Sequence, residues 1–474
     1  MRQVIHTVAQ FATHVLLLSL CAQVSQGQTE KPVFLPSPGQ IANVVCASDA
    51  NQSYALYLPS NYTVTKRWPI IYFFDPGGRG RRPLDLYKDL AETYGFVFAG
   101  SNNSRNFSGD ESQAVNAIWQ DTHVRLSLDE RRVYTSGLSG GARVAGAMAL
   151  SSPGQISGVI AHGAGYPIRH SSTDKLLYFF AVGDKDFNWP EVITVGHERE
   201  RNGLPYRVRV YSGSHQWATA SVMEDAVQWL QLRAMQAGDL PRDNAFIDRQ
   251  FQKLQKEADD AGEAHDALAQ LAAYRSMASD FIGLREMNAA TAKLAVLKQS
   301  VAVKAALKNE QEEISDQLRI EREISPKLRT YESGDVSDPN ALRVEIVQAM
   351  NGLKDQAAHA KHEAERLVLQ RAFQDMVVEG MENGQQEFEA KHFDKAESCF
   401  DLMQQISDDP WPMLMLAETR AAMGSKKQAL KDLREAVRRG LKDAGILESD
   451  KQLQVLNTEP GFQKLLAELR GKSQ

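Results

Sequence analysis

The sequence places a serine in a glycine-rich turn between a strand-like and a helix-like segment. Residues 133–135 are β-branched or aromatic, which predicts a short buried strand, and residues 142–150 are alanine-rich, which predicts a helix. Between them, residues 137–141 form a Gly-x-Ser-x-Gly pattern. Such a turn strains its serine, and the flanking glycines let neighbouring chains approach without a Cβ clash. We therefore expect the Ser139 hydroxyl to lie exposed above a helix N-terminus, where the amide of Gly140 can stabilise a developing oxyanion.

Strand-like and helix-like segments alternate over the first half of the chain. Strands are expected at residues 53–58, 69–74, 96–100, 133–135, 158–161, 176–182 and 206–211, and helices at residues 84–94, 113–125, 142–150, 192–202 and 218–235. This alternation predicts a mostly parallel sheet that is covered by helices on both faces. The chemistry of such sheets gathers at the carboxyl ends of the strands.

Chemistry-bearing residues follow several of these strands. A glycine loop at residues 75–80 follows an early central strand, and it predicts either an oxyanion loop or an ordinary glycine turn. A phosphate cradle would require a Lys-Ser/Thr signature that this loop lacks. Asp184 and Asp186 follow a late strand and His215 follows the next one. With Ser139 they give the chain order Ser, Asp, His, which is the order of an α/β-hydrolase triad.

On these residues, positions 53 to 237 resemble the α/β-hydrolase superfamily, and most of all its exported esterases of the polyhydroxybutyrate-depolymerase and feruloyl-esterase type. The resemblance implies that Ser139 is the nucleophile of a serine esterase and that His215 is the general base. It also implies an acid three residues after Gly183, which is Asp186, with Asp184 as the alternative. No cofactor or metal is expected.

The glycine loop departs from the pattern of that family. Relatives often have His-Gly before the oxyanion residue, whereas this chain has Asp75 and Pro76. Proline has no N–H to donate. Gly77 is therefore the expected oxyanion donor beside Gly140, with Gly78 next in line.

The sequence around the expected triad bears on the substrate. The link over residues 161–175 is too short for an inserted cap domain, so the site would admit bulky or polymeric esters unless another part of the chain covers it. The expected substrate is a small-molecule or polymeric ester. Trp189 and Trp217 lie near triad members in the sequence, and ordinary packing is favoured over an aromatic platform for each.

The N-terminus and the overall charge indicate where the protein works. Residues 1–27 contain an arginine, a short apolar run and then small or polar residues, which is typical of a secretory signal peptide; the alternative is a terminal helix. No other segment approaches the length of a membrane span. The net charge of −6 gives no reason to expect nucleic-acid binding. We expect an exported protein, periplasmic or secreted.

The second half of the chain predicts an all-α region after a hydrolase domain at residues 35–240. Helix formers dominate residues 241–375, where we expect a helical linker or hairpin broken at Pro326 and at residues 334–339. Residues 376–470 are similar to tetratricopeptide repeats. The similarity lies in small or apolar residues that recur at an offset of 33: Gly384, Ala396 and Phe400, then Ala417, Ala429 and Leu433.

Three hypotheses follow for the function. The first is an exported serine esterase with a helical-repeat appendage, which either binds a protein partner or packs against the hydrolase. The second is a catalytically silent hydrolase-fold protein that acts as a binding or scaffold module through its repeats. The third is a serine peptidase, which shares the triad and differs in the leaving group.

Overall fold

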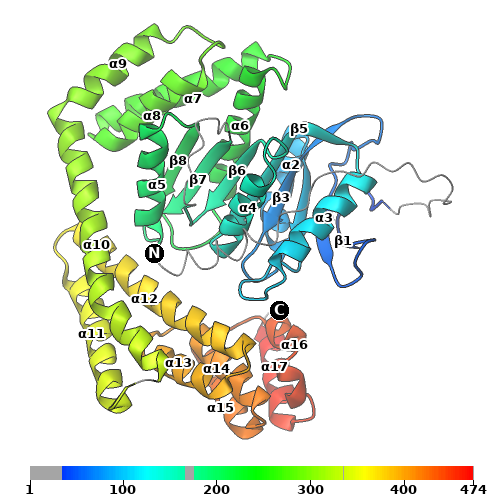
Figure 1. Ribbon diagram of the computed structural model, residues 1–474, viewed down its shortest axis with the longest axis vertical. Coiled ribbons are helices and arrows are strands. Elements are labelled where there is room, and N and C mark those ends of the chain that lie inside the picture. The colour runs from blue at the N-terminus through cyan, green and yellow to red at the C-terminus, as the bar shows by residue number, and fades with distance from the viewer. Residues whose placement is uncertain (1–34, 166–175, 335, 473–474) are drawn as a thin grey trace. The chain divides into compact units, whose positions relative to one another are not determined.

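The computed structural model describes residues 35–165, 176–334 and 336–472 (Figure 1). The chain forms two compact units, Met1–Glu310 and Gln311–Gln474. The expected signal peptide at residues 1–27 lies outside the described residues.

The first unit is built on an eight-stranded sheet in the order β1-β2-β4-β3-β5-β6-β7-β8. The strands are β1 (Ile41–Val45), β2 (Ser53–Tyr57), β3 (Trp68–Phe74), β4 (Val97–Ser101), β5 (Leu128–Leu138), β6 (Gly158–His162), β7 (Leu177–Gly183) and β8 (Tyr206–Tyr211). The six strands from β4 to β8 in this order are parallel, while β2 pairs antiparallel with both β1 and β4. The expected α/β-hydrolase fold is confirmed, with β1 as an additional edge strand that the sequence pattern did not predict.

Helices cover both faces of this sheet (Figure 1). They are α2 (Arg81–Tyr94), α3 (Glu111–Arg125), α4 (Gly140–Ser151), α5 (Trp189–Arg201) and α6 (Ala220–Ala237). The buried strand β3 shows why both faces must be covered. The side chain of Phe73 packs in one cluster with residues of α2 and α6. The preceding residue, Tyr72, points to the other face of the sheet, where its hydroxyl hydrogen-bonds to the hydroxyl of Thr122 in α3. Thr135, the register partner of Tyr72, bonds to a carbonyl of α4.

Three more helices belong to the first unit: α7 (Asn244–Glu263), α8 (Ala267–Asp280) and α9 (Asn288–Gln299). Side chains of the edge strand β8 join them to the sheet. Arg207 forms a buried ion pair of 2.6 Å with Asp280 of α8, and Arg209 bonds to Glu257 of α7. The sequence grouped these helices with the following region, and the four-part domain division stays a prediction.

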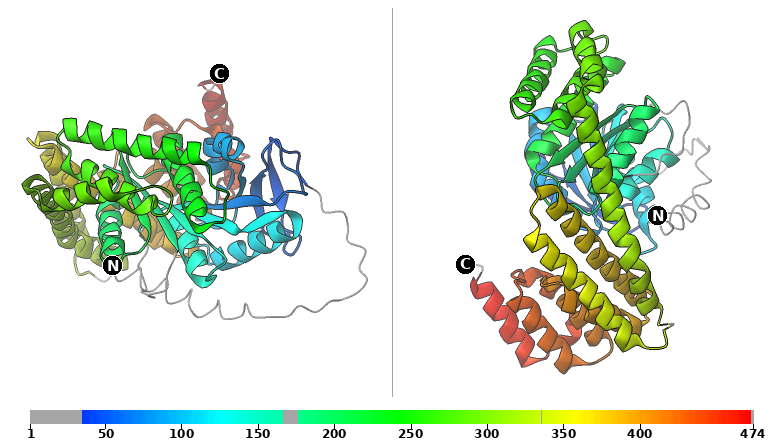
Figure 2. Two further views of the ribbon diagram at one scale, coloured as in Figure 1. Left: turned by 90° about the horizontal axis from the view of Figure 1, so that it is seen from above. Right: turned by 90° about the vertical axis from the view of Figure 1, so that its left-hand side faces the viewer.

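The second unit is all-helical, as expected (Figure 2). Its helices are the larger part of α10 (Val301–Ser333), then α11 (Pro339–His359), α12 (Glu363–Glu389), α13 (Phe393–Ile406), α14 (Pro410–Ala422), α15 (Lys426–Arg438), α16 (Ala444–Ser449), a 3₁₀ turn (Leu453–Leu456) and α17 (Pro460–Lys472). Gly384 and Ala417 are each buried in a helix, and a Cβ on Gly384 would lie 2.6 Å from the Phe400 ring. The recurring small residues therefore sit where helices pack closely. Their assignment to tetratricopeptide repeats stays a prediction.

The expected break at Pro326 is wrong, because this proline lies inside α10. Pro326 removes the hydrogen bond to the carbonyl of Arg322, but both residues are exposed and water can bond that carbonyl. Ile324 and Leu328 anchor the opposite face of the helix in the core. The expected break after α10 does occur, at Gly334 with φ +73°.

Removing the carboxylate of Asp280 tests the link between α8 and the sheet. Asp280→Ala leaves Arg207 buried without its partner, so we expect the free energy of unfolding to fall by about 3 to 5 kcal/mol. Lys256→Ala is the control, since it removes an ion pair with Asp260 that is exposed to solvent, and such pairs contribute little to stability. Urea denaturation measures both variants, and equal losses would contradict the expectation.

Candidate active site

Ser139 occupies the turn between β5 and α4 with a φ of +54°. This left-handed conformation is strained for a residue with a Cβ and costs about 1–3 kcal/mol. The backbone around it is packed so closely that only glycine fits. A Cβ on Gly137 would lie 2.2 Å from the carbonyl carbon of Gly141, and a Cβ on Gly141 would lie 1.9 Å from the carbonyl oxygen of Phe74. The sharp turn and the role expected for the flanking glycines are therefore present.

Asp186 and His215 come together at the ends of β7 and β8. His215 Nδ1 donates to Asp186 Oδ1 over 2.9 Å, and the amide of Asn188 donates to the same oxygen over 2.9 Å. The Asp186 carboxylate is fully buried. With Nδ1 as the donor, Nε2 of the imidazole is left as the acceptor.

The alternative acid, Asp184, makes a different contact. Its Oδ1 accepts the amide of Gly213 over 2.9 Å, which fastens the loop that carries His215. Of the two aspartates considered, Asp186 is thus the one that bonds to the imidazole. Asp184 shapes the loop instead.

The dipeptide His162-Gly163 at the end of β6 links the serine turn to the Asp186–His215 pair. The amide of Ser139 donates to the carbonyl of His162 over 2.9 Å. A Cβ on Gly163 would lie 2.6 Å from Asp186 Oδ2 and 3.0 Å from His215 Nδ1. Serine, histidine and aspartate therefore gather around two consecutive residues. Within the described residues, no hydrogen bond joins the Ser139 hydroxyl to the imidazole, and such bonds are often long in unliganded enzymes.

Asp75 stood out in the sequence only because it departs from the family pattern. In the structure its side chain is fully buried and accepts several hydrogen bonds. Its Oδ2 accepts the indole N–H of Trp217 over 2.9 Å, and its Oδ1 accepts Arg79 Nε over 2.8 Å. Trp217 lies two residues after His215. Asp75 therefore ties the loop after β3 to the loop that carries the histidine.

The Asp75 carboxylate also accepts the N–H of Gly77, which the sequence analysis assigned to the oxyanion. The N–H of Gly77 donates to Asp75 Oδ1 over 2.9 Å, and the N–H of Gly78 donates to the Asp75 carbonyl over 2.9 Å. Gly140 differs because it lies in the first turn of α4, where amides have no acceptor within the helix. Gly140 therefore stays a predicted donor, whereas Gly77 would have to give up its bond to Asp75 before it could donate to the oxyanion.

Both tryptophans near the site are buried, as ordinary packing requires. Trp217 is 5% exposed and packs against Phe73, Tyr87 and His162, and Trp189 is 8% exposed at the start of α5. The link expected to be too short for a cap lies partly outside the described residues, at 166–175.

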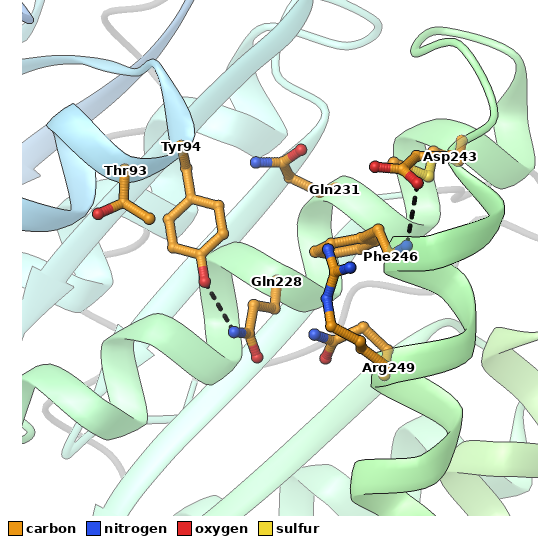
Figure 3. Close-up of a pocket in the computed structure, with 9 residues that line it drawn as sticks. Thr93, Tyr94, Gln228, Gln231, Asp243, Phe246 and Arg249 are labelled. Atoms are coloured by element: carbon orange, nitrogen blue, oxygen red, sulfur yellow. Dashed lines mark hydrogen bonds between the residues drawn. The ribbon is translucent and has the colours of Figure 1, made fainter.

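A pocket of about 400 Å³ lies elsewhere, between the end of α2, α6 and α7 (Figure 3). Tyr94 and Gln228, which share a 2.7 Å hydrogen bond, line it together with Phe246 and Arg249. Tyr94 is the last residue of α2, which runs back from the end of β3. The pocket therefore lies toward the amino ends of the parallel strands, whereas Ser139 follows the carboxyl end of β5.

Among the residues that the structure describes, no group of three or more His, Cys, Asp or Glu residues is arranged to hold a metal ion. None of the helices there combines the length and the apolarity needed to cross a membrane.

Comparisons with known proteins add similar folds at low identity. No protein-family model matches the chain, and no curated protein matches it. Similar solved structures include an S-formylglutathione hydrolase from Staphylococcus aureus, with 13% identity, 42% of this chain and 99% of that chain covered, and a TM-score of 0.34. A ferulic acid esterase has 15% identity, covers 41% of this chain and 98% of its own, and gives a TM-score of 0.35. A feruloyl esterase module from Clostridium thermocellum has 14% identity, with 40% and 86% covered and a TM-score of 0.31. Since all three TM-scores are below 0.5, these similarities support no inference about activity.

Substituting the serine separates backbone strain from chemistry. Ser139→Gly removes the strain of the positive φ, whereas Ser139→Ala keeps it. We expect the glycine variant to exceed the alanine variant by about 1 kcal/mol in free energy of unfolding, after the larger entropy of glycine in the unfolded chain is subtracted. Thermal or urea unfolding of the two variants measures the difference. Equal stabilities would mean that the turn stores no strain.

His162 makes stability depend on pH, because burial lowers the pKa of its imidazole from 6.5 to about 3. The unfolded chain binds the proton more readily than the folded chain, so this stabilisation is complete above about pH 6.5 and is lost as the pH falls towards 3. We expect the His162 imidazole to lower the free energy of unfolding by about 2 kcal/mol when the pH falls from 7 to 5. His162→Asn should show a shallower loss over that range. Titration of the wild-type imidazole by NMR gives a second measurement, and protonation near pH 6.5 in the folded protein would contradict the expectation.

Proposed function

We propose that the protein is an exported serine hydrolase that cleaves carboxylic esters through an acyl-enzyme intermediate. Ser139 is the nucleophile, His215 the general base and Asp186 the residue that orients the imidazole. The observation that carries the proposal is the 2.9 Å bond from His215 Nδ1 to the buried Asp186, beside the serine in its strained turn. Strained backbone and a buried carboxylate that orients an imidazole concentrate at catalytic sites.

Each group has one task in the reaction. His215 Nε2 takes the proton of Ser139 Oγ as this oxygen bonds to the acyl carbon, and the carbonyl oxygen becomes an oxyanion. The tetrahedral intermediate expels the alcohol, which receives the proton from His215. Water then repeats the sequence on the acyl-enzyme and releases the acid. Asp186 keeps Nδ1 protonated and stabilises the imidazolium, and the amide of Gly140 stabilises the oxyanion.

Closure of the serine onto the histidine is a requirement of this mechanism. Ser139 contacts His162 through its backbone N–H, and His215 lies beside Gly163. A rotation of the Ser139 side chain about χ1 or a small shift of the loop that carries His215 is the motion needed to bring them together. The side chain of His215 is 17% exposed, so part of the imidazole is accessible to solvent.

The second unit is proposed to act as a helical-repeat module of the tetratricopeptide type, with a groove for a protein partner. Its support is the close packing at residues that recur with an offset of 33, including Gly384 and Ala417. Export rests on the composition of residues 1–27.

A fluorophosphonate probe tests the proposed activity, because it reacts with activated serines. We expect labelling of the wild type and none of Ser139→Ala. Turnover of p-nitrophenyl esters should fall roughly a million-fold for His215→Ala, as in subtilisin, and roughly ten-thousand-fold for Asp186→Asn, as in trypsin. Asp184→Asn is the matched control: it makes the same change in the same loop and should keep most of the activity.

The outcomes separate the hypotheses. Folded wild type that is not labelled would remove the enzyme and favour the catalytically silent module. Labelled wild type that cleaves amides in preference to esters would replace the esterase with a peptidase. A larger loss in Asp184→Asn than in Asp186→Asn would exchange the roles of the two acids.

A further inference from the structure

The residues expected to supply a second oxyanion donor from the loop after β3 have no free N–H in this structure. Pro76 has no N–H, the N–H of Gly77 is held by the Asp75 carboxylate, and the N–H of Gly78 is held by the Asp75 carbonyl. The carboxylate is also fixed by Trp217 and Arg79. Because Asp75 is fully buried, releasing Gly77 would remove one of the bonds that satisfy a buried charge.

The side chain of Asn106 lies against Gly140. Asn106 belongs to the loop after β4, and its amide donates to the carbonyl of Pro76 over 2.9 Å. Gly140 is one of the two residues predicted to donate to the oxyanion. A Cβ on Gly140 would lie 2.1 Å from Asn106 Oδ1 and 2.6 Å from Asn106 Nδ2. The carboxamide therefore occupies the space that the side chain of any other residue at position 140 would fill.

The carboxamide of Asn106 has donor capacity to spare. Among the described residues, no hydrogen bond involves its side-chain nitrogen or oxygen, although the residue is half-buried. Its Oδ1 lies nearer to the Cβ position of Gly140 than its Nδ2 does, at 2.1 Å against 2.6 Å, and a rotation of the carboxamide about Cβ–Cγ exchanges the two atoms. The next residue, Phe107, has a φ of +62°, so the loop holds a second strained residue beside the site.

We propose that Asn106 is a catalytic residue whose Nδ2–H donates to the oxyanion alongside the amide of Gly140. This inference rests on the proposed function, since it needs an acyl substrate on Ser139. It explains two departures together: Asp75 can hold Gly77 because the oxyanion has another donor, and position 140 is glycine because the carboxamide needs its space. The site would stabilise a carbonyl oxygen that gains negative charge, as in esters and thioesters.

Two substitutions at Asn106 test the proposal on the full chain. Asn106→Ala removes the carboxamide, and Asn106→Asp keeps its shape but replaces the donor with a carboxylate. Loss of one oxyanion donor lowers kcat by roughly 100- to 1,000-fold with little change in KM. We expect a loss of this size in both variants on p-nitrophenyl esters, with unchanged melting temperatures. A structural role would instead lower the melting temperature in Asn106→Ala, and the shape-preserving aspartate would restore activity.

Asn103→Ala is the matched control from the same loop. The Asn103 carboxamide accepts the N–H of Ser53 and donates to the carbonyl of Asn51, whereas the atoms nearest to the Cβ position of Gly140 belong to Asn106. Its removal should lower the melting temperature while kcat stays close to that of the wild type. A fall in kcat as large as that of Asn106→Ala would assign the effect to loop order and overturn the proposal.

A double-mutant cycle with Gly140→Ala provides a second readout. The added methyl group displaces the carboxamide, so Gly140→Ala alone should lower kcat, and the double variant with Asn106→Ala should be no slower than Asn106→Ala. Additive losses would overturn the proposal. If folded wild type is labelled by fluorophosphonate and both Asn106 variants keep their kcat, the inference fails and the proposed function stands. If folded wild type is not labelled, both fail.

Discussion

The close approach of three backbone segments beneath Ser139 is the constraint on which the site depends. Position 141 lies against the carbonyl of Phe74 at the end of β3, and position 137 lies against position 141. Only glycine fits at either place, because a Cβ would overlap backbone atoms that cannot move. This contact presses the N-terminus of α4 onto the central strands and holds Ser139 in its positive φ. The packing of the buried sheet stabilises the fold by more than the strained conformation of Ser139 costs.

A second layer of polar contacts sets the loops above the sheet. Asp186 orients His215, Asp184 fastens the loop before it, and Asp75 binds the tryptophan after it. Both oxygens of the buried Asp75 carboxylate accept N–H donors, which offsets the cost of burying its charge. Asp186 differs, because its Oδ1 accepts two N–H donors while its buried Oδ2 has no hydrogen-bond partner among the described residues. The site is thus organised by short-range bonds between neighbouring strand ends and leaves the helices to cover the sheet.

Much of the fold followed from local patterns. The apolar run of β3 predicted a strand covered on both faces, and all seven of its residues are buried. The edge strand β1 was missed because its short pattern carries little signal until β2 pairs with it. Pro326 was misjudged because a proline on the exposed face of a helix costs less when the opposite face is packed in a core.

Some residues of the site could be predicted from the sequence, and others come together only in the folded chain. The family resemblance implied Asp186 in preference to Asp184, and the structure pairs Asp186 with His215, while its catalytic role stays a prediction. The bond that occupies Gly77 could not be foreseen, since it depends on where the Asp75 side chain turns. Asn106 was missed as a functional candidate because it lies 33 residues before Ser139 in the chain and reaches Gly140 only when β4 and β5 take their places on either side of β3. The departure at Asp75 and Pro76 was the one signal that pointed to this region.

The most direct test is a crystal structure of the wild-type protein after reaction with a fluorophosphonate. We expect the phosphorus on Oγ of Ser139, the His215 Nε2 within about 3.2 Å of that oxygen, and the imidazole still bonded to Asp186. An adduct on another residue, or an imidazole directed away from the modified serine, would contradict the central claim that these three side chains act as one catalytic unit.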